Sequence, residues 1–453
     1  MFSTNALDKL RATRTGFIQE PKFEKLGKVS DIVGTLVEAH LKEVPLGALV
    51  RIFDESSSYD IQGEVVGFRK DKALIVPFSD PAGICANSYV QCLEREQRIR
   101  VGHHLIGRIL DGYCNPIIGP KFQPNEGVPW AISREPLNPL TRRRISRPLD
   151  LGVRAINSLL TCGEGQRLGI FAGSGVGKSV LMGMIGRYTQ ADVNVIALIG
   201  ERGREVKEFI DDCLGEEGLK KSVVIVSTGD QSPLIRIRAA HVATAVSEYF
   251  RESGYSVLLM MDSLTRVAMA QREIGLAVGE PPTTKGYTPS VFSLLPRLLE
   301  RAGNSSSKGS LTGIYTVLVD GDDFSEPVCD AARSILDGHI VLSRDLAAKN
   351  HYPAIDVLRS ASRVMVDVAG KEQVDHGSEL RNLLATYKHN EDLISIGAYN
   401  RGTNPRIDRA IDMQPRIETF LRQGRNHNAS YDDSVSALSE LLSIDVASDS
   451  ARG

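Results

Sequence analysis

Short apolar runs alternate with helical patterns through the middle of the chain. Each run is four to seven residues long and carries almost no charge, as expected of strands buried on both faces of a parallel sheet. The runs are Arg167–Ala172, Val193–Ile199, Val223–Val226, Val257–Met261 and Ile314–Val319. The clearest helix between them begins at Ser232, has Pro233 in its first turn and stops at Gly254. This pattern predicts an α/β domain built on a mainly parallel sheet.

The segments on either side of this domain follow other patterns. Before it, short strand-like stretches recur at a spacing typical of a small closed β-barrel. They include Ile32–Val37, Leu49–Phe53, Glu64–Phe68 and Ala73–Pro77. After about residue 375 the periodicity becomes helical, as in Ser378–Tyr387 and Asp432–Leu442. We therefore expect an amino-terminal arm over 1–25, a β-barrel domain over 26–98, an α/β core over 99–374 and a carboxy-terminal helical domain over 375–453.

The expected arm has a weak amphipathic pattern, with Leu7, Leu10 and Phe17 spaced among basic residues. This pattern is compatible with a short helical arm that binds a partner and, equally, with a frayed and solvated terminus. A second connecting segment, Gly112–Pro148, is rich in Pro and Gly and ends in the basic run Thr141–Arg147. We interpret it as a linker whose arginines form a solvated face, because such runs are seldom nucleic-acid sites.

Charge and cysteine content narrow the classes of function. The 453 residues include 54 Lys and Arg against 56 Asp and Glu, a net charge of −2, so the chain has no global field that attracts nucleic acid or anionic lipid. Any bound phosphate must therefore be held by a local site. Six scattered cysteines without a C-x-x-C pair are typical of reduced thiols in a cytosolic protein. No apolar run approaches the roughly 18 residues that span a bilayer, so membrane contact is expected only through a partner.

A phosphate-binding loop, AGSGVGKS over Ala172–Ser179, follows the first of these strands and precedes a helical stretch. In such a loop the backbone N–H groups bind phosphate oxygens, Lys178 reaches the β- and γ-phosphates, and the Ser179 hydroxyl coordinates Mg²⁺. Ala172 replaces the first glycine of the usual pattern, a change that the three remaining glycines should tolerate. The expected nucleotide-binding residues here are Gly173, Ser174, Gly175, Val176, Gly177, Lys178, Ser179 and Val180.

Two acidic residues follow other strands and complete the candidate site. Asp262 ends the run Val257–Met261, at the edge of the sheet where ligands collect, and is the expected second acid for Mg²⁺. Glu201 follows the strand that ends at Ile199, where a carboxylate can polarise a water in line with the γ-phosphate. Either acid could instead be an ordinary polar residue closing a buried strand.

Several longer motifs, in order along nearly the whole chain, resemble those of one family. They are LDLGVRAINSLLTCGEGQRLGIFAGSGVGKS, IGERGREVKEF, LLMMDSLTRVAMAQREIGLAVGEPPTTKGYTPSVF, SILDGHIVLSR, NHYPAIDVL and SASRVM. The chain resembles the flagellum-specific ATPases, which belong to the type III secretion ATPases and are similar to the head subunits of rotary ATP synthases. The resemblance implies a RecA-like P-loop NTPase core, and Ala172 is ordinary for this branch.

The resemblance also implies roles for single residues. Glu201 would be the water-activating catalytic residue, with Arg202 beside it, and Arg266 would border the site. Arg363 in SASR matches the arginine finger that enters the neighbouring subunit's site, where its guanidinium would stabilise transition-state charge. Tyr352 corresponds to an aromatic that packs on the adenine ring.

The implied activity is Mg²⁺-dependent ATP hydrolysis that energises the export of flagellar proteins by a homohexamer with nucleotide sites between subunits. The implied partners are a central coiled-coil stalk protein, a peripheral regulatory protein on the amino-terminal arm, an export gate membrane protein, and complexes of export chaperones with cargo. No nucleic acid is expected. The implied location is the cytoplasm, with peripheral attachment to the inner membrane through the export apparatus.

Three alternatives remain open. A virulence injectisome ATPase would share every catalytic residue; LLMMDSLTRVAMAQREIG and TTKGYTPSVF favour the flagellar branch, whereas SASRVM occurs in both. A Rho-type RNA translocase would need a basic, aromatic amino-terminal platform, but residues 29–98 contain many acidic residues. A non-catalytic rotary head subunit is disfavoured because Lys178, Glu201 and Asp262 are all present.

Overall fold

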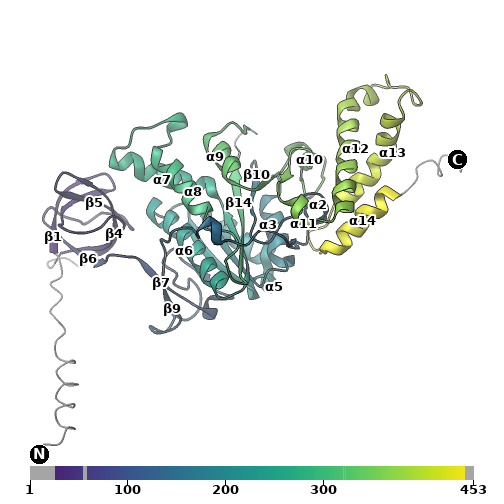
Figure 1. The fold of residues 1–453 in the computed structure, drawn as a ribbon. Coiled ribbons are helices and arrows are strands. Elements are labelled where there is room, and N and C mark those ends of the chain that lie inside the picture. Colours follow the sequence, from purple (N-terminus) through teal and green to yellow (C-terminus); the bar gives the residue numbers. More distant parts are fainter. Residues whose placement is uncertain (1–25, 55–58, 320, 322, 444–453) are drawn as a thin grey trace, which may run out of the picture. The chain divides into compact units, whose positions relative to one another are not determined.

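The computed structural model describes residues 26–54, 59–319, 321 and 323–443, drawn in colour in Figure 1. They fall into two units with a boundary between Gln97 and Arg98. The expected amino-terminal arm over 1–25 lies outside the described residues. The α/β fold class predicted from the sequence is confirmed in the second unit, and the expected barrel forms the first.

The first unit is a closed six-stranded barrel with the strand order β1-β2-β5-β4-β3-β6. Its strands are β1 (Leu26–Val33), β2 (Leu36–His40), β3 (Leu49–Phe53), β4 (Asp60–Arg69), β5 (Lys72–Pro77) and β6 (Tyr89–Glu94). All neighbouring strands pair antiparallel, so closure leaves no strand edge unpaired. Alternate side chains fill the interior, and Val37, Val50, Ile52, Val65 and Val90 are fully buried.

The expectation of one continuous strand over Ile32–Val37 is wrong. The chain turns within it, because β1 ends at Val33 and β2 begins at Leu36, and Ile32 faces Val37 across the hairpin. Gly34 adopts a φ of 61°, which the tight turn requires and which glycine adopts without strain. Apolar residues on both arms of the turn gave the appearance of a single run.

The second unit is built on an eight-stranded sheet with the order β16-β15-β10-β14-β13-β11-β12-β8. Its strands in chain order are β8 (Ile109–Leu110), β10 (Arg167–Ala172), β11 (Val193–Glu201), β12 (Ser222–Thr228), β13 (Ser256–Asp262), β14 (Ser310–Leu318), β15 (Gly338–Val341) and β16 (Ala361–Ser362). All pairs are parallel except β15 with the edge strand β16. The carboxyl ends of β10, β11 and β13 therefore meet at one edge, where a site can form.

Helices pack against this sheet and bury apolar side chains on it (Figure 1). They are α2 (Arg154–Leu159), α3 (Lys178–Tyr188), α4 (Gly203–Glu208), α5 (Gly215–Lys220), α6 (Pro233–Glu252), α7 (Leu264–Val278), α8 (Pro289–Leu299), α9 (Pro327–Ile335), α10 (Arg344–Ala348) and α11 (Met365–Val368), with a π-helical turn over Phe209–Leu214. The helix expected from Ser232 is confirmed as α6, and the Ser232 hydroxyl accepts the backbone N–H of Ile235 at its start. A separate ribbon pairs β7 (Arg98–Val101) with β9 (Val128–Ala131).

Three helices at the carboxy-terminal end pack on one another and on α2 (Figure 1). They are α12 (Lys371–Ser395), α13 (Pro405–Leu421) and α14 (Tyr431–Ser443). Leu380, Met413 and Leu438, one from each helix, are fully buried in the same apolar cluster as Ile156 of α2. The helical end is thereby joined to the core by packing as well as by the chain.

The basic run Thr141–Arg147 is only partly a solvated face, so that interpretation needs correction. Arg142 donates to the carbonyl oxygens of Leu137, Glu300 and Ala302, and its side chain is largely buried. Arg143 donates to three further carbonyls in residues 305–309, whereas Arg144 is exposed. Both arginines thus bind backbone carbonyl oxygens, a role that sequence composition does not indicate.

Candidate functional site

The phosphate loop lies between β10 and α3 at the carboxyl edge of the sheet. Gly175 and Gly177 have φ values of 78° and 90°, so both positions need the left-handed conformation that glycine adopts freely. Gly177 is the residue before α3 and no side chain caps this helix. The first N–H groups of α3 therefore remain available to an anion, reinforced by the helix dipole. Val176 is buried in the core and anchors the middle of the loop.

Three charged side chains predicted from separate strands converge behind this loop. The Lys178 ammonium forms an ion pair with the Asp262 carboxylate, and its Nζ lies 3.5 Å from Oε1 of Glu201. The exposed fractions of the Lys178, Glu201 and Asp262 side chains are 12%, 13% and 4%. Burial alone would lower the pKa of Lys178, but the two carboxylates hold it above its ordinary value. The lysine thus stays charged in the position where a phosphate group would bind.

Asp262 has a further partner that the sequence analysis did not identify. The Thr316 hydroxyl, on the adjacent strand β14, donates to Oδ1 of Asp262 at 2.6 Å. Both residues are buried, so this hydrogen bond orients a carboxylate that has little access to water. The sequence held one signal for this role, because Thr316 is a polar residue inside the apolar run Ile314–Val319.

Glu201 has the acid–base property expected of a general base. Burial raises its pKa to about 7; Lys178 opposes this shift, and Asp262 and Glu205 add to it. A hydrogen bond from Glu201 lowers the pKa of Glu205, so the pair favours a proton on Glu201 and a charge on Glu205. A group that titrates near neutral pH can accept a proton from water and release it again.

The two arginines expected beside the site lie in different surroundings. Arg202 has an 84% exposed side chain and forms an ion pair with Glu205, at 3.0 Å from Nη1 to Oε1. Arg266, at the start of α7, packs against Gly200, where an added Cβ would lie 2.8 Å from the Cβ of Arg266. Gly200 also has a φ of 74° and immediately precedes Glu201, so a glycine is needed for the strand end and the arginine to approach.

A cavity of about 390 Å³ adjoins the phosphate loop. Tyr352 lines it with a 41% exposed side chain, and its ring would lie 3.4 Å from a Cβ added at Gly177. Gln423, Gly424 and Arg425, which follow α13 and were not expected to contribute, also line the cavity, and the Gln423 N–H donates to the carbonyl of Tyr352. Apolar lining with one exposed aromatic suits a flat base, which can stack on the tyrosine ring.

Arg363 is not brought to the phosphate loop of its own chain. It directly follows β16, is exposed, and its backbone N–H donates to the Asp337 carbonyl at 3.0 Å. The Asp337 N–H in turn donates to the carbonyl of Arg167, the first residue of β10. Ala172 ends that strand, and at roughly 3.3 Å per residue the strand separates the two ends by about 17 Å. This is more than an arginine side chain spans, so Arg363 does not reach the phosphate loop of its own chain.

The loop also offers oxygen ligands for a cation. Ser179 is exposed at the start of α3, and the Asp262 carboxylate lies beside Lys178. No cluster of three or more His, Cys, Asp or Glu residues that could hold a metal is found among the described residues. One hydroxyl and one carboxylate next to a phosphate site suit Mg²⁺, which binds few protein ligands and completes its shell with phosphate oxygens and water.

Two protein families match the chain. The ATP synthase alpha/beta family, nucleotide-binding domain, matches residues 152–362, which contain the phosphate loop, both acids and β16. The T3SS EscN ATPase C-terminal domain matches residues 369–440, which contain α12, α13 and most of α14. Within the described residues, no helix is long and apolar enough to cross a membrane.

Curated relatives and solved structures match at high identity. The flagellum-specific ATP synthase of Bacillus subtilis is 51% identical over 420 residues, covering 92% of this chain and 95% of the relative. The type 3 secretion system ATPase of Xanthomonas euvesicatoria is 48% identical, covering 92% and 94%. The structure of the assembled ATPase EscN from enteropathogenic E. coli matches with a TM-score of 0.87 at 46% identity, covering 92% and 100%, and that of EscN with its central stalk EscO matches with 0.85.

Proposed function

The chain belongs to the family of flagellum-specific and type III secretion ATPases, and we propose that it hydrolyses ATP to energise flagellar protein export as a homohexameric ring. Its enzymatic activity is ATP hydrolysis. The observation that carries the proposal is the convergence of Lys178, Glu201 and Asp262 at the phosphate loop. A non-catalytic head subunit would have no need of all three.

In the proposed reaction each residue acts on one part of the nucleotide. Backbone N–H groups of residues 173–180 bind phosphate oxygens, and Lys178 leaves its carboxylate partners to contact the β- and γ-phosphates. Glu201 orients a water opposite the leaving group and accepts its proton as the water attacks the γ-phosphate. Arg266 borders the γ-phosphate and Arg202 lies on the exposed side of the site. Tyr352 stacks on the adenine ring.

Mg²⁺ is part of this proposal. The Ser179 hydroxyl would coordinate it and Asp262 would bind it directly or through water, since both oxygens lie beside the phosphate loop. When bound, Mg²⁺ neutralises charge on the β- and γ-phosphate oxygens. Thr316 would hold the Asp262 carboxylate in position throughout.

The distance of Arg363 from its own phosphate loop supports a ring of subunits. An exposed arginine at the sheet edge can enter the site of the next subunit and stabilise charge on the transferring phosphoryl group. EscN, which is similar along 92% of this chain, has been solved as an assembly and in complex with a central stalk. We extend both features to this chain, as a homohexamer around a central coiled-coil stalk protein.

The remaining partners follow from the function. We propose that the amino-terminal arm binds a peripheral regulatory protein and that the helical end meets complexes of export chaperones with their cargo. Contact with an export gate membrane protein would hold the ring at the inner membrane on its cytoplasmic side. A virulence injectisome ATPase is the second candidate function, favoured by the 48% identity to a type 3 secretion system ATPase.

Two experiments test the proposed function. Lys178→Ala should abolish ATP turnover, because it removes the only lysine of the phosphate loop, whereas Arg363→Ala should keep nucleotide binding and lose roughly 10³-fold in kcat. Deleting the gene in its host should stop the secretion of flagellar subunits and swimming, and restoring the wild-type gene, but not Lys178→Ala, should recover both. Normal motility in the deletion strain with loss of another secretion pathway would favour the injectisome.

A further inference from the structure

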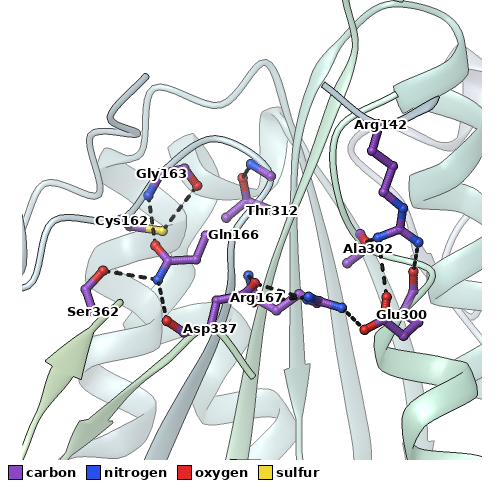
Figure 2. A network of polar contacts seen from close by, with 11 residues as sticks. Arg142, Cys162, Gly163, Gln166, Arg167, Glu300, Ala302, Thr312, Asp337 and Ser362 are labelled. Atoms are coloured by element: carbon purple, nitrogen blue, oxygen red, sulfur yellow. Dashed lines mark hydrogen bonds and ion pairs between the residues drawn. The ribbon is translucent and has the colours of Figure 1, made fainter. Parts of the chain in front are cut away.

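A network of polar side chains lies around Arg167, at the end of β10 opposite to the phosphate loop. Figure 2 shows Arg167 between Asp337 and Glu300, which it joins through its guanidinium. Asp337 accepts three hydrogen bonds from Arg167, from its backbone N–H and Nε at 3.0 Å and from Nη2 at 3.1 Å. Glu300 is also paired with Arg142. Asp337 is thus fixed at the residue directly before β15.

A second part of the network fixes the edge strand β16. The Gln166 amide Nε2 donates to the Ser362 hydroxyl at 3.1 Å, and its Oε1 accepts the backbone N–H of Gly163 (Figure 2). The Ser362 hydroxyl donates in turn to the carbonyl of Thr161 at 2.8 Å. Gln166 is fully buried, so these bonds form without competition from water.

The two parts meet at the backbone of Arg363. β16 has only two residues and pairs with β15 at just two positions, so the ladder alone holds it weakly. Ser362 is held by Gln166 from one side, and the Arg363 N–H is held by the Asp337 carbonyl from the other. Gly338 lets the strands approach, because a Cβ there would lie 2.7 Å from the carbonyl oxygen of Ala361.

We propose that Gln166, Arg167 and Asp337 are positioning residues that set where Arg363 enters the neighbouring subunit's nucleotide site. This rests on the proposed role of Arg363 as an arginine finger acting between subunits. The Arg363 side chain is exposed, so its aim depends on where its backbone is held. Arg167 is also the first residue of β10, which Gln166 directly precedes and which ends at the phosphate loop. One strand therefore ties a subunit's own nucleotide site to the arginine that it lends to the next.

The size of the expected effect follows from geometry. A displacement of about 1 Å at a catalytic group costs roughly 10²-fold in rate. Asp337→Asn keeps the side-chain volume but removes the charge that holds the Arg167 guanidinium, and Ser362→Ala removes the contact with Gln166. Each should lower kcat by about 10- to 10²-fold, with little change in KM for ATP, because the finger acts chiefly in the transition state.

Mixed rings test whether these residues act on the neighbouring subunit. In rings that mix Asp337→Asn with Lys178→Ala chains, the intact site of the first chain faces the intact finger of the second. Activity should therefore exceed that of either variant alone, as it should for Arg363→Ala mixed with Lys178→Ala. Asp192→Asn is the matched control, since Asp192 accepts the N–H of Ser256 at the same sheet edge away from β16. It should keep wild-type kcat.

The outcomes are distinguishable. In each test, one variant is mixed with Lys178→Ala chains and ATPase activity is measured. If activity recovers with Arg363→Ala but not with Asp337→Asn or Ser362→Ala, the network supports only its own chain's site, and the proposal is overturned. A wild-type kcat in both network variants would overturn it as well. If activity does not recover even with Arg363→Ala, Arg363 does not act as an arginine finger on the neighbouring subunit. If Asp337→Asn fails to fold, Ser362→Ala carries the same test alone.

Discussion

The residues of the phosphate loop are already engaged with one another before any nucleotide is considered. Lys178 is neutralised by Asp262 and Glu201, and Asp262 also accepts the Thr316 hydroxyl. A buried lysine with two carboxylates satisfies the rule that buried charge must be paired. In the proposed reaction, phosphate oxygens compete with these carboxylates for Lys178, which frees Asp262 to act on the metal ion and Glu201 to act on the attacking water.

The proposed role of Glu201 as the general base predicts that the rate of hydrolysis depends on pH near neutrality. A general base works only when deprotonated, and burial raises the pKa of this carboxyl to about 7. We expect kcat/KM, which reports the free enzyme, to be half-maximal at about pH 7 and to fall about tenfold per pH unit below it. Glu205 adds to the raised pKa, so Glu205→Ala should move the midpoint to lower pH. A flat profile between about pH 6 and 8 would contradict this assignment.

Thr316 gives a second prediction at the scale of a residue. Thr316→Val preserves the side-chain shape but removes the donor to Oδ1 of Asp262. Hydrogen bonds to charged groups contribute about 1.5–3 kcal/mol, so kcat/KM should fall by tenfold or more. Thr312→Val is the control, because Thr312 lies on the same strand but accepts the N–H of Gly165 far from the phosphates. If steady-state kinetics show the same decrease in kcat/KM for both variants, Thr316 has no role in the site.

Among the elements, the segment after α13 links the helical end of the chain to the nucleotide pocket. Gln423 accepts the Arg154 N–H and donates to the carbonyls of Gly152 and His427, and its own N–H donates to the carbonyl of Tyr352. These bonds hold α2, the tyrosine turn and the α13–α14 connection together. We therefore expect a movement of the helical end to change the shape of the cavity beside the phosphate loop.

Gln423→Ala should weaken both stability and nucleotide binding. It leaves the half-buried Arg154 N–H without a partner, at about 1–3 kcal/mol, and removes one of the two donors to the Gly152 carbonyl, a loss of stability that urea unfolding would detect. The KM for ATP should rise because the wall formed by residues 423–425 is no longer fixed. Gln190→Ala, an exposed glutamine in the same unit, is the control. An unchanged KM with reduced stability would show that the segment is only structural.

The elements also show how far local sequence predicts this molecule. The bounds of β10 and the positions of Lys178, Glu201 and Asp262 were predictable, because each depends on a strand, its end and the residue that follows. Contacts between distant segments were not. The contacts of Gln423 and the carbonyl contacts of Arg142 are set by packing, for which their neighbours in the sequence give no signal. Thr316 stands out as a polar residue in an apolar run, but its partner Asp262 lies 54 residues away in the sequence. The roles assigned to Arg363 and Tyr352 came from the resemblance, and they remain predictions.

At the scale of the whole molecule, the proposed mechanism needs a second chain, because Arg363 lies at the opposite end of β10 from its own phosphate loop. The length of β10, about 17 Å, separates the two, so in the proposed mechanism the arginine comes from a neighbouring chain. Specific ATPase activity should therefore rise with protein concentration as rings form, and then level off. Adding excess Lys178→Ala chains to dilute wild-type protein should raise the specific activity of the wild type, because these chains supply the finger. The double variant Lys178→Ala, Arg363→Ala should not, even though light scattering finds the same assemblies. A chain that stays monomeric and keeps a constant specific activity would show that hydrolysis needs no second subunit.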